Sequence, residues 1–409
     1  MKFIHISDLH FGKSLFGYSL IEEKDQIFWV KEFLKLVKEE KVDAVLIAGD
    51  IYDRAIAPKE AVELLDYFLN ELVKLKVKIL MIAGNHDSGT RLEFGSNIFK
   101  SKDIYIAGEL KKELEVVTLQ DEYGEINFYL VPYIFPALVS TIYEDDDIKT
   151  YNDAFKKILD EANIDYTKRN VIVSHQTVLN SNEDLMVDGS EIFIGTSGAI
   201  SVNLYEKFDY AALGHIHVAQ KIKYEHVRYS GSILPYHFSQ RQDKKVMIIE
   251  IKEKGQITYK EESLKLLHNM REIKGYYKDI LKEESNNNLR NEYLRVVLKD
   301  QAVDTDARIR LNELFEAKNS KLMELALDRT EYKSHYNEIN HSRNDKTLEE
   351  YFNDFYRLRN NDEFMDEKDM MIVNYISENI KNSNDEDYNN PSKKDIDDIV
   401  DYVLKMEDE

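Results

Sequence analysis

Five short motifs within the first 217 residues are rich in side chains that bind metal ions. In chain order they are Asp8-Leu9-His10, Gly49-Asp50-Ile51-Tyr52-Asp53, Gly84-Asn85-His86-Asp87, Ser174-His175 and Gly214-His215-Ile216-His217. Carboxylate oxygen and imidazole nitrogen suit hard divalent ions, whereas thiolates select softer metals. The chain has no cysteine. The motifs together therefore indicate a two-metal site of the kind that hydrolyses phosphate esters.

Each motif directly follows an apolar run rich in β-branched residues. The runs cover residues 2–6, 44–48, 79–83, 171–173 and 210–213. Such runs predict buried strands, so each motif is expected where a strand ends and a loop begins. Open α/β sheets bind their ligands at that edge.

Two ions in such a centre lie roughly 3.5–4 Å apart, which requires a carboxylate that bridges them. Asp50 is the predicted bridge. Asp8 and His10 are two residues apart, as are His215 and His217, and side chains at this spacing in an extended segment project to the same side. We assign the first metal to Asp8, His10, Asp50 and His217, and the second to Asp50, Asn85, His175 and His215.

Two further motif residues, His86 and Asp53, and Arg54, which follows the second motif, are predicted to assist the reaction. Hydrolysis releases an alkoxide that needs a proton, and His86 suits that role. Asp53 could hold the His86 imidazole in the required tautomer, as carboxylates beside metal sites do. Arg54 could grip a phosphate oxygen with its planar guanidinium, although a surface cation near the start of a helix explains it equally well.

A single Asp-x-His or Gly-x-His pair is common and usually structural. All five motifs in order, each at a strand end, favour a functional site. The other histidines match no motif and are interpreted as ordinary: His5, His226, His237, His268, His335 and His341.

The five motifs resemble those of the calcineurin-like metallophosphoesterase superfamily. More narrowly, the opening residues 2–12 and the stretch at 48–54 resemble the SbcD family, the nuclease subunits of bacterial SbcCD complexes, which are related to the nuclease of archaeal and eukaryotic double-strand-break repair. The resemblance covers nearly the whole chain and is strongest up to about residue 240.

The resemblance implies a fold, an activity and partners. The fold would be α/β, a metallophosphoesterase β-sandwich flanked by helices, with a small α/β capping domain and a helical C-terminal tail. The activity would be a DNA nuclease with two Mn²⁺ ions, acting as a 3′→5′ exonuclease on duplex ends and an endonuclease on hairpins and single strands. The partner would be an SbcC-type ATPase with a coiled coil, in an assembly with two copies of each subunit.

Length and composition agree with several domains. At 409 residues the chain is long enough for two or three. It has no signal segment and no apolar run near 18 residues, so we expect a cytoplasmic protein. Fourteen of its fifteen glycines lie at or before residue 255, which indicates that the remainder is built differently.

Residues 1–265 are expected to form the nuclease domain. Amphipathic stretches at 23–40 and 58–76 alternate with strands, and 227–230, 245–251 and 257–262 are predicted strands. Residues 266–335 are expected to form the capping domain: a helix at 270–282, a strand at 293–299, a helix at 305–317 and a strand at 321–327. The alternative is a simple packing domain.

Residues 336–409 form an acidic tail with 21 Asp and Glu against 9 Lys and Arg, which is −12 of the net charge of −22. Helical spacing relates a mostly aromatic set of residues, Leu348, Tyr351, Phe352, Phe355, Tyr356 and Arg359, and a second apolar cluster covers 370–376. These patterns predict helices that dock a partner. The alternative is that both faces fold back onto the chain's own core.

The acidity is unusual for an enzyme that binds DNA, because duplex binding rests on neutralisation of phosphates by Lys and Arg. Metal ions and a partner are expected to supply the missing positive charge. No phosphate-binding Gly-x-x-x-x-Gly-Lys-[Ser/Thr] motif occurs, so any ATP dependence must come from another chain.

Segments 58–76 and 91–100 are candidates for a homodimer interface, because helices after the second and third motifs form one in the family. Their apolar residues are Ala61, Leu65, Phe68, Leu69, Leu72, Leu92, Phe94, Ile98 and Phe99. Burial of the first segment against the chain's own sheet explains its pattern equally well.

Two other function classes remain open from sequence. One is a metallophosphoesterase that acts on a small phosphodiester or a phosphoprotein, which would need neither a capping domain nor a docking tail. The other is a non-catalytic scaffold, against which the complete set of ligands argues.

Overall fold

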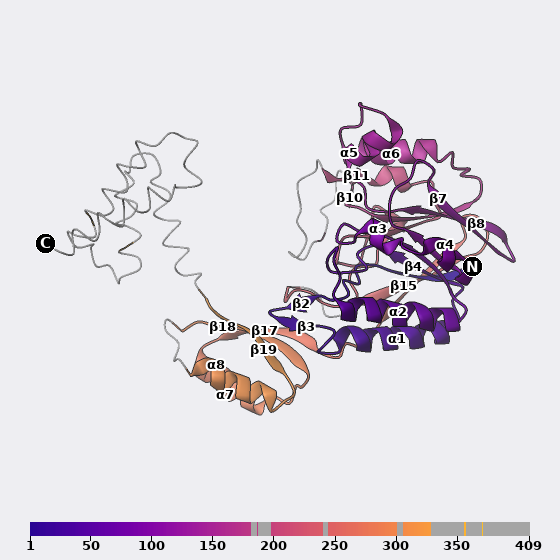
Figure 1. Cartoon of the computed structure of the whole chain (residues 1–409). Coiled ribbons are helices and arrows are strands. Elements are labelled where there is room, and N and C mark those ends of the chain that lie inside the picture. Colours follow the sequence, from indigo (N-terminus) through magenta and orange to yellow (C-terminus); the bar gives the residue numbers. More distant parts are fainter. Residues whose placement is uncertain are drawn as a thin grey trace. The chain divides into compact units, whose positions relative to one another are not determined.

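The computed structural model describes residues 1–180, 186, 198–239, 244–300, 306–328, 356 and 370 (Figure 1). The chain divides into two compact units, Met1–Leu327 and Asp328–Glu409. The predicted docking segments lie outside the described residues except for Tyr356 and Met370, both of which are helical. No helix among the described residues is both long and apolar enough to cross a membrane.

The first sheet contains the strands that precede the first three motifs. Its order is β16-β15-β1-β4-β5-β6. Strands β1, β4, β5 and β6 run parallel, and β15 and β16 are antiparallel additions at one side. The bounds are β1 Lys2–Ile6, β4 Ala44–Ala48, β5 Lys78–Ile82, β6 Ile104–Ala107, β15 Lys245–Ile251 and β16 Ile257–Ser263. Parallel pairing brings the carboxyl ends of β1, β4 and β5 to one edge.

The second sheet contains the strands of the last two motifs. Its order is β13-β14-β12-β9-β8-β7, with β8, β9, β12 and β14 parallel. The bounds are β7 Glu115–Asp121, β8 Gly124–Val131, β9 Arg169–His175, β12 Tyr210–Gly214, β13 Gln220–Ile222 and β14 Tyr224–Tyr229. Gly214 lies opposite His175 in the register, so the fourth and fifth motifs are neighbours.

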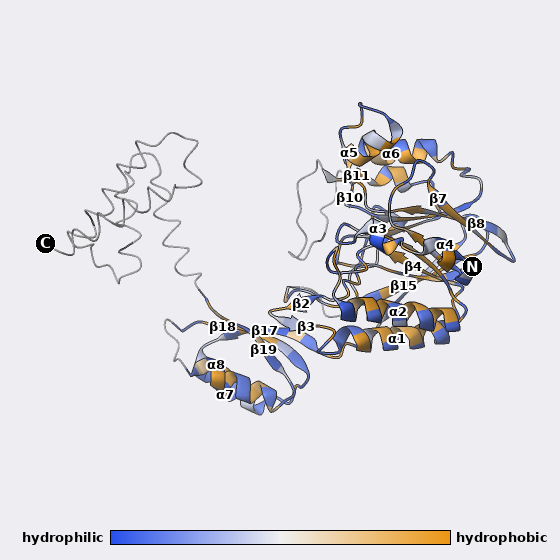
Figure 2. Ribbon diagram, in the orientation of Figure 1, coloured by the Kyte–Doolittle hydropathy of each residue, from blue (hydrophilic) through white to orange (hydrophobic). Residues whose placement is uncertain are grey.

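The two sheets pack face to face around an apolar cluster that includes Phe3, Leu46, Phe128, Val171 and Tyr210. Runs such as 44–48 are buried along their whole length, because one face meets the other sheet and the opposite face meets helices. Helices α1 (Asp25–Glu40) and α2 (Lys59–Lys74) cover the first sheet, and α5 (Pro136–Tyr143) and α6 (Tyr151–Glu161) cover the second (Figure 1). Figure 2 shows that the central strands are largely hydrophobic and that these helices are amphipathic, with hydrophobic and hydrophilic residues on different sides. This is the predicted sandwich of sheets flanked by helices.

A third sheet, β17-β18-β19, is parallel and carries two helices on one side. We call this region the capping unit. Its elements are β17 Asn269–Gly275, α7 Tyr277–Asn286, β18 Glu292–Leu298, α8 Ala307–Glu316 and β19 Lys321–Leu327. The predicted strands at 293–299 and 321–327 and the helix at 305–317 are confirmed within the described residues.

The helix predicted over 270–282 is wrong in its first half. Residues 269–275 form a strand that pairs with β18, and the helix begins only after Gly275. Arg271, Glu272 and Lys274 are residues that favour helices locally, but pairing with β18 and burial of Met270 in the core override that preference.

The remaining elements are short. They are β2 Ser14–Leu15, β3 Tyr18–Ser19, α3 Gly89–Leu92, α4 Ser96–Phe99, β10 Val178–Leu179 and β11 Ile200–Ser201, with 3₁₀ turns at Lys100–Lys102 and Val202–Tyr205.

Candidate metal centre

The first two motifs lie on loops that run side by side. The backbone N–H of Asp8 donates to the carbonyl of Gly49 at 3.0 Å, and that of His10 donates to the carbonyl of Asp50 at 2.9 Å. Asp8, His10 and Asp50 all have left-handed backbones, with φ of 53°, 44° and 50°. Such conformations are disfavoured for residues with a Cβ and persist where the surroundings impose them, often at functional sites.

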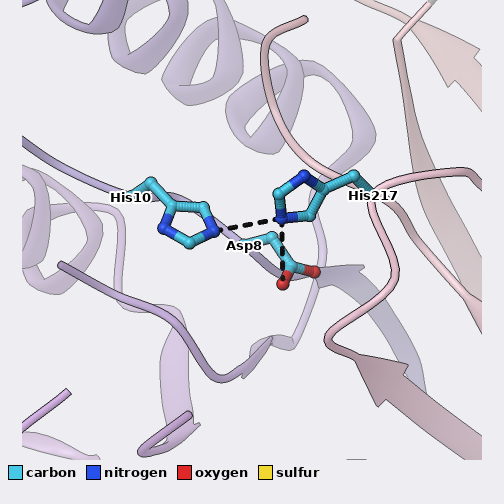
Figure 3. Close-up of side chains that lie close together, drawn as sticks. All are labelled: Asp8, His10 and His217. Carbon is cyan, nitrogen blue, oxygen red and sulfur yellow. Dashed lines mark hydrogen bonds and ion pairs between the residues drawn. The ribbon is translucent and has the colours of Figure 1, made fainter. Parts of the chain in front are cut away.

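Asp8, His10 and His217 gather at the first predicted metal position (Figure 3). The Nε2 atoms of His10 and His217 are 3.1 Å apart, and Nε2 of His217 is 4.0 Å from Oδ1 of Asp8. Two nitrogens that are each about 2.1 Å from one ion, at right angles, lie about 3 Å apart. The separation of these two imidazoles therefore fits a shared ion.

Asn85, His175 and His215 gather at the second predicted position. Nδ1 of His175 donates to the carbonyl of Ala48 at 2.7 Å, which directs its Nε2 toward Oδ1 of Asn85 at 3.1 Å. Nδ1 of His215 lies 3.0 Å from the same amide oxygen. A hydrogen bond from the other ring nitrogen fixes the tautomer of a ligating histidine, and His175 has this arrangement.

Asp50 lies between the two positions. One of its oxygens is 3.6 Å from Nε2 of His10 and 3.3 Å from Nε2 of His175. Among the described residues, three sets bring ligand atoms within 4.8 Å of one another, and Asp50 belongs to two of them: Asp8-His10-His217, Asp8-Asp50-His175 and His10-Asp50-His86. Asp50 is therefore within reach of both groups of imidazoles, and its bridging role stays a prediction.

Burial makes this cluster electrostatically costly without a cation. Burial raises the pKa of Asp8 to about 6, with Asp50 adding to the shift and His175 opposing it. Burial would also raise the pKa of Asp50, but the charges of His175 and His10 hold it well below its usual range. Burial and the charge of His175 lower the pKa of His215 to about 3. Buried charges in proteins are paired or bind metals, so the donor set fits divalent ions.

His86 lies next to these ligands. Its backbone N–H donates to Oδ1 of Asp50 at 2.9 Å, and its ring meets that of His10 edge-on at 4.8 Å between centroids. Its Nδ1 is 2.8 Å from the carbonyl oxygen of Asp53. Nε2 is therefore the nitrogen left to face a substrate.

The prediction that the Asp53 carboxylate contacts His86 is wrong, because a different group of Asp53 makes this contact. The main-chain carbonyl of Asp53 holds His86, and the carboxylate instead accepts from Nζ of Lys13 at 2.7 Å and lies 3.7 Å from Nδ1 of His10. The loop turns the Asp53 side chain toward the first motif, which the spacing of the residues did not reveal. Arg54 is exposed, which leaves its guanidinium accessible to a ligand.

Sequence reasoning gave no role to Asp87, the last residue of the third motif. Its carboxylate accepts from the backbone N–H groups of Ile51, Tyr52 and Gly84 at 2.9–3.0 Å. It therefore ties the loop after β5 to the loop after β4, and so holds Asn85 and His86 near Asp50. The position of Asp87 inside the motif was the only signal.

Two glycines of the motifs are explained by close approach. A Cβ on Gly84 would lie 2.1 Å from Oδ1 of Asp50, and a Cβ on Gly214 would lie 1.8 Å from the carbonyl oxygen of Ala48. Any other residue at either position would displace the Asp50 carboxylate or separate the two sheets. The glycines therefore let the five loops converge.

The candidate dimer surface is only partly available. Ala61, Leu65 and Phe68 of α2 are buried in the chain's own core, as are Leu72 and Leu92. Phe94 and Ile98 are 85% and 74% exposed. The first helix is therefore used internally, and exposed apolar residues remain in the second segment.

Comparisons with known proteins agree with this site. Residues 1–219 match the family described as calcineurin-like phosphoesterase, and residues 267–360 match the family described as type 5 capsule protein repressor C-terminal domain, SbcD_C. Two similar relatives are both named as SbcD subunits of the nuclease SbcCD. That of Staphylococcus epidermidis is 32% identical over 77% of this chain and 83% of its own length, and that of Staphylococcus saprophyticus is 33% identical over 77% and 82%.

Two solved structures are similar at low identity. The Thermus thermophilus protein TT1561 has a TM-score of 0.36 at 9% identity, over 63% of this chain and 97% of its own. A dimetal phosphatase from Danio rerio has a TM-score of 0.37 at 12% identity, over 64% and 96%.

The match to the phosphoesterase family covers more than half of the chain, and each relative is more than 30% identical over most of its length. Residues 1–219, which match the phosphoesterase family, include the five motifs and the cluster around Asp50. The chain therefore belongs to the calcineurin-like phosphoesterases and, within them, to the SbcD nuclease family of metal-dependent phosphodiester hydrolases.

Proposed function

We propose that this chain is a Mn²⁺-dependent DNA nuclease that acts as a 3′→5′ exonuclease on duplex ends and as an endonuclease on hairpins and single strands. Its cellular role would be in DNA repair, recombination and replication, together with an ATPase partner. One observation carries the proposal: a buried carboxylate, Asp50, lies between two groups of imidazoles in a chain that belongs to the SbcD family.

Asp8, His10, Asp50 and His217 would hold the first ion, and Asp50, Asn85, His175 and His215 the second. The distances between neighbouring donor atoms within these sets, from 3.0 to 4.0 Å, support both assignments. When bound, the ions would neutralise the phosphate charge and make water a stronger nucleophile. The two imidazoles in each set favour Mn²⁺ over Mg²⁺, which prefers oxygen ligands and keeps its waters.

Three residues near the ions would each have a separate role in the reaction. His86 in its imidazolium form would give its Nε2 proton to the departing oxygen, because its Nδ1–H is already held by the Asp53 carbonyl. The Asp53 carboxylate would orient His10, because it lies 3.7 Å from Nδ1 of that ring. This Nδ1 atom is buried and makes no hydrogen bond to the described residues. Arg54 would contact a phosphate oxygen of the substrate.

The domain scheme remains part of the proposal: a nuclease domain at 1–265, a capping domain at 266–335 and a docking tail at 336–409. The expected boundary at 265 falls between β16 and β17. The tail would bind the coiled-coil base of an SbcC-type ATPase in an assembly of two plus two subunits. The relatives' name, which places them in an SbcCD nuclease, supports such a partner.

A homodimer would form through the exposed residues of segment 91–100. Phe94 and Ile98 are large, apolar and exposed, which is typical of an interaction surface. Val62 and Tyr67 are the large apolar residues of α2 that remain exposed, and they are the part of 58–76 that could extend this surface.

The test is the degradation of a duplex labelled at one end on either strand, with purified full-length protein and Mn²⁺. Shortening from the 3′ end supports the proposal. Hydrolysis of a small phosphodiester such as bis-p-nitrophenyl phosphate, with all DNA left intact, would favour a phosphoesterase with a small substrate. A phosphoprotein substrate, tested beside them, covers the remaining alternative.

A further inference from the structure

The first turn of α1 contacts two regions that are far apart in sequence. Its first two residues, Asp25 and Gln26, are both buried, with 3% and 0% of their surface exposed. A buried carboxylate beside a buried amide is unusual in the first turn of a surface helix, where polar side chains normally face water. Each must therefore be satisfied by a specific partner.

Gln26 holds the loop that carries His10. Its Nε2 donates to the carbonyl of His10 at 2.8 Å and reaches the carbonyl of Leu9 at 3.4 Å, while its Oε1 accepts from the backbone N–H of Gly12 at 3.0 Å. One side chain thus binds three parts of the loop after the first strand.

That loop needs to be held. Asp8, His10 and Gly12 have φ of 53°, 44° and 92°, so its backbone visits the left-handed region three times within five residues. Without the hydrogen bonds of Gln26, the loop would relax toward more favourable angles, and the imidazole of His10 would move with it.

Asp25 holds the capping unit. Its carboxylate accepts from the hydroxyl of Tyr293 at 2.5 Å and lies 3.0 Å from Nδ1 of His268. The rings of His268 and Tyr293 stack at 4.5 Å between centroids. His268, which matches no motif and is expected to be ordinary, is therefore part of the junction.

The junction also includes apolar contacts from all three strands of the capping sheet. Tyr293, Met270 and Met323 come one from each strand of the capping sheet, and all three belong to the same apolar cluster as Trp29 of α1. Lys321 of β19 also pairs with Glu23, just before α1, and lies over the ring of Tyr18. The first turn of α1 is thus fixed to the capping unit on several sides.

We propose that Asp25 and Gln26 are positioning residues that couple the capping unit to the first metal position. Tyr293 and His268 fix Asp25, the shared helical turn fixes Gln26, and Gln26 fixes His10. The inference rests on the metal centre of the proposed function and adds a route by which the capping unit controls metal affinity. Because such coupling is reciprocal, a ligand that displaces the capping unit changes Mn²⁺ affinity.

The test is Mn²⁺ titration of the metal-free, full-length protein by calorimetry, which needs no nucleic acid. Tyr293→Phe removes only the hydroxyl that reaches Asp25, and Gln26→Met removes the amide at similar length. Tyr277→Phe is the matched control, because the hydroxyl of this capping-unit tyrosine is buried without a hydrogen-bond partner among the described residues. Thermal unfolding of each variant verifies that it is folded.

Gln26→Met is expected to weaken one of two Mn²⁺ binding steps by about 10-fold or more, as loss of a group that supports a ligand does. Tyr293→Phe is expected to weaken the same step by about 3-fold to 10-fold, the range of one hydrogen bond. Tyr277→Phe should match the wild type. The double variant should bind like Gln26→Met alone, because Tyr293 acts through Gln26.

Wild-type affinity in Tyr293→Phe would overturn the inference, even if Gln26→Met failed to fold. Effects that multiply in the double variant would overturn it too, because they would mean two independent routes. Both outcomes leave the proposed function intact. A wild-type chain that binds no Mn²⁺ would instead overturn the proposed function, and the inference with it.

Discussion

Replacement of His86 by Gln separates the proton donor from the metal ligands. His86 contacts the site in two ways: its backbone N–H donates to Asp50 at 2.9 Å, and its ring Nδ1 lies 2.8 Å from the Asp53 carbonyl. The first contact survives this substitution, because the backbone N–H makes it. A glutamine amide can also donate to the carbonyl, so the variant keeps the local structure and loses only the acid.

The expected loss follows from that role. A positioned general acid contributes about 10²–10⁴-fold to the rate, which is roughly 3–5 kcal/mol of activation free energy at 1.36 kcal/mol per factor of ten. We therefore expect kcat on DNA to fall by that factor while two metal ions remain bound. The assay is elemental analysis of the loaded protein beside a Mn²⁺-dependent nuclease measurement.

Asp50→Ala is the comparison variant, and it should lose both metal and activity because Asp50 lies between the two ligand groups. The outcome for His86→Gln is not trivial, since His86 also belongs to a potential ligand group with His10 and Asp50. Loss of one metal ion in His86→Gln would refute the role of proton donor and make His86 a ligand.

Three further predictions concern stability and partners. Arg169 is 4% exposed, pairs with both oxygens of Asp121 and donates to three carbonyls. Arg169→Met should therefore lower the free energy of unfolding by about 3–5 kcal/mol in a denaturant titration, because it removes one partner of a buried ion pair and the donor to those carbonyls. The Asp121 carboxylate keeps its ion pair with the amino group of Met1. Burial raises the pKa of Asp121, but the pairing with Arg169 outweighs it and holds that pKa below its usual range. The pairing therefore stabilises the fold above the ordinary pKa of an aspartate, and this stabilisation is lost as the pH falls through the lowered value. The difference in stability between wild type and Arg169→Met should shrink in acid, and a difference that does not change with pH would exclude the pairing as its source. Phe94→Ser with Ile98→Ser should convert a dimer to a monomer in sedimentation experiments with unchanged unfolding temperature, and an unchanged dimer would place the interface elsewhere. We expect a chain that ends near residue 337 to keep Mn²⁺-dependent cleavage of single-stranded DNA and to lose the ATPase partner. The double variant Tyr351→Ala with Phe355→Ala should behave in the same way. Normal co-purification of the partner with either variant would refute the role of the tail in docking.

The strands and the position of the site were predictable because each apolar run that predicts a strand ends at a polar motif that predicts a ligand. Apolar runs such as 44–48 end directly at a polar motif, and parallel strands bring such ends to one edge. Those two facts were sufficient to bring Asp50 near His10 and His175. The failure at β17 has the opposite cause, because residues 270–274 favour a helix locally and only pairing with β18 makes them a strand.

Details at the level of single atoms were not predictable. Spacing indicated that Asp53 could serve His86, but not that its carbonyl would do so while its carboxylate turned to Lys13. Asp25 and Gln26 gave no signal, because a polar pair at the start of an amphipathic helix is normally exposed. Their roles depend on the capping unit and on the loop after β1, which are remote in sequence from each other.

The most direct test of the two-metal account is a titration of Mn²⁺, Mg²⁺ and Zn²⁺ into metal-free protein with one labelled duplex as substrate. Each proposed ion has four protein ligands, two of which are imidazoles, so Mg²⁺ should bind poorly. Zn²⁺ should bind more tightly than Mn²⁺, but it often settles into four-coordinate geometry that leaves no room for the substrate. We predict cleavage with Mn²⁺, little with Mg²⁺ alone and inhibition by added Zn²⁺. Full activity in Mg²⁺ without Mn²⁺ would contradict both the choice of metal and the assignment of its ligands.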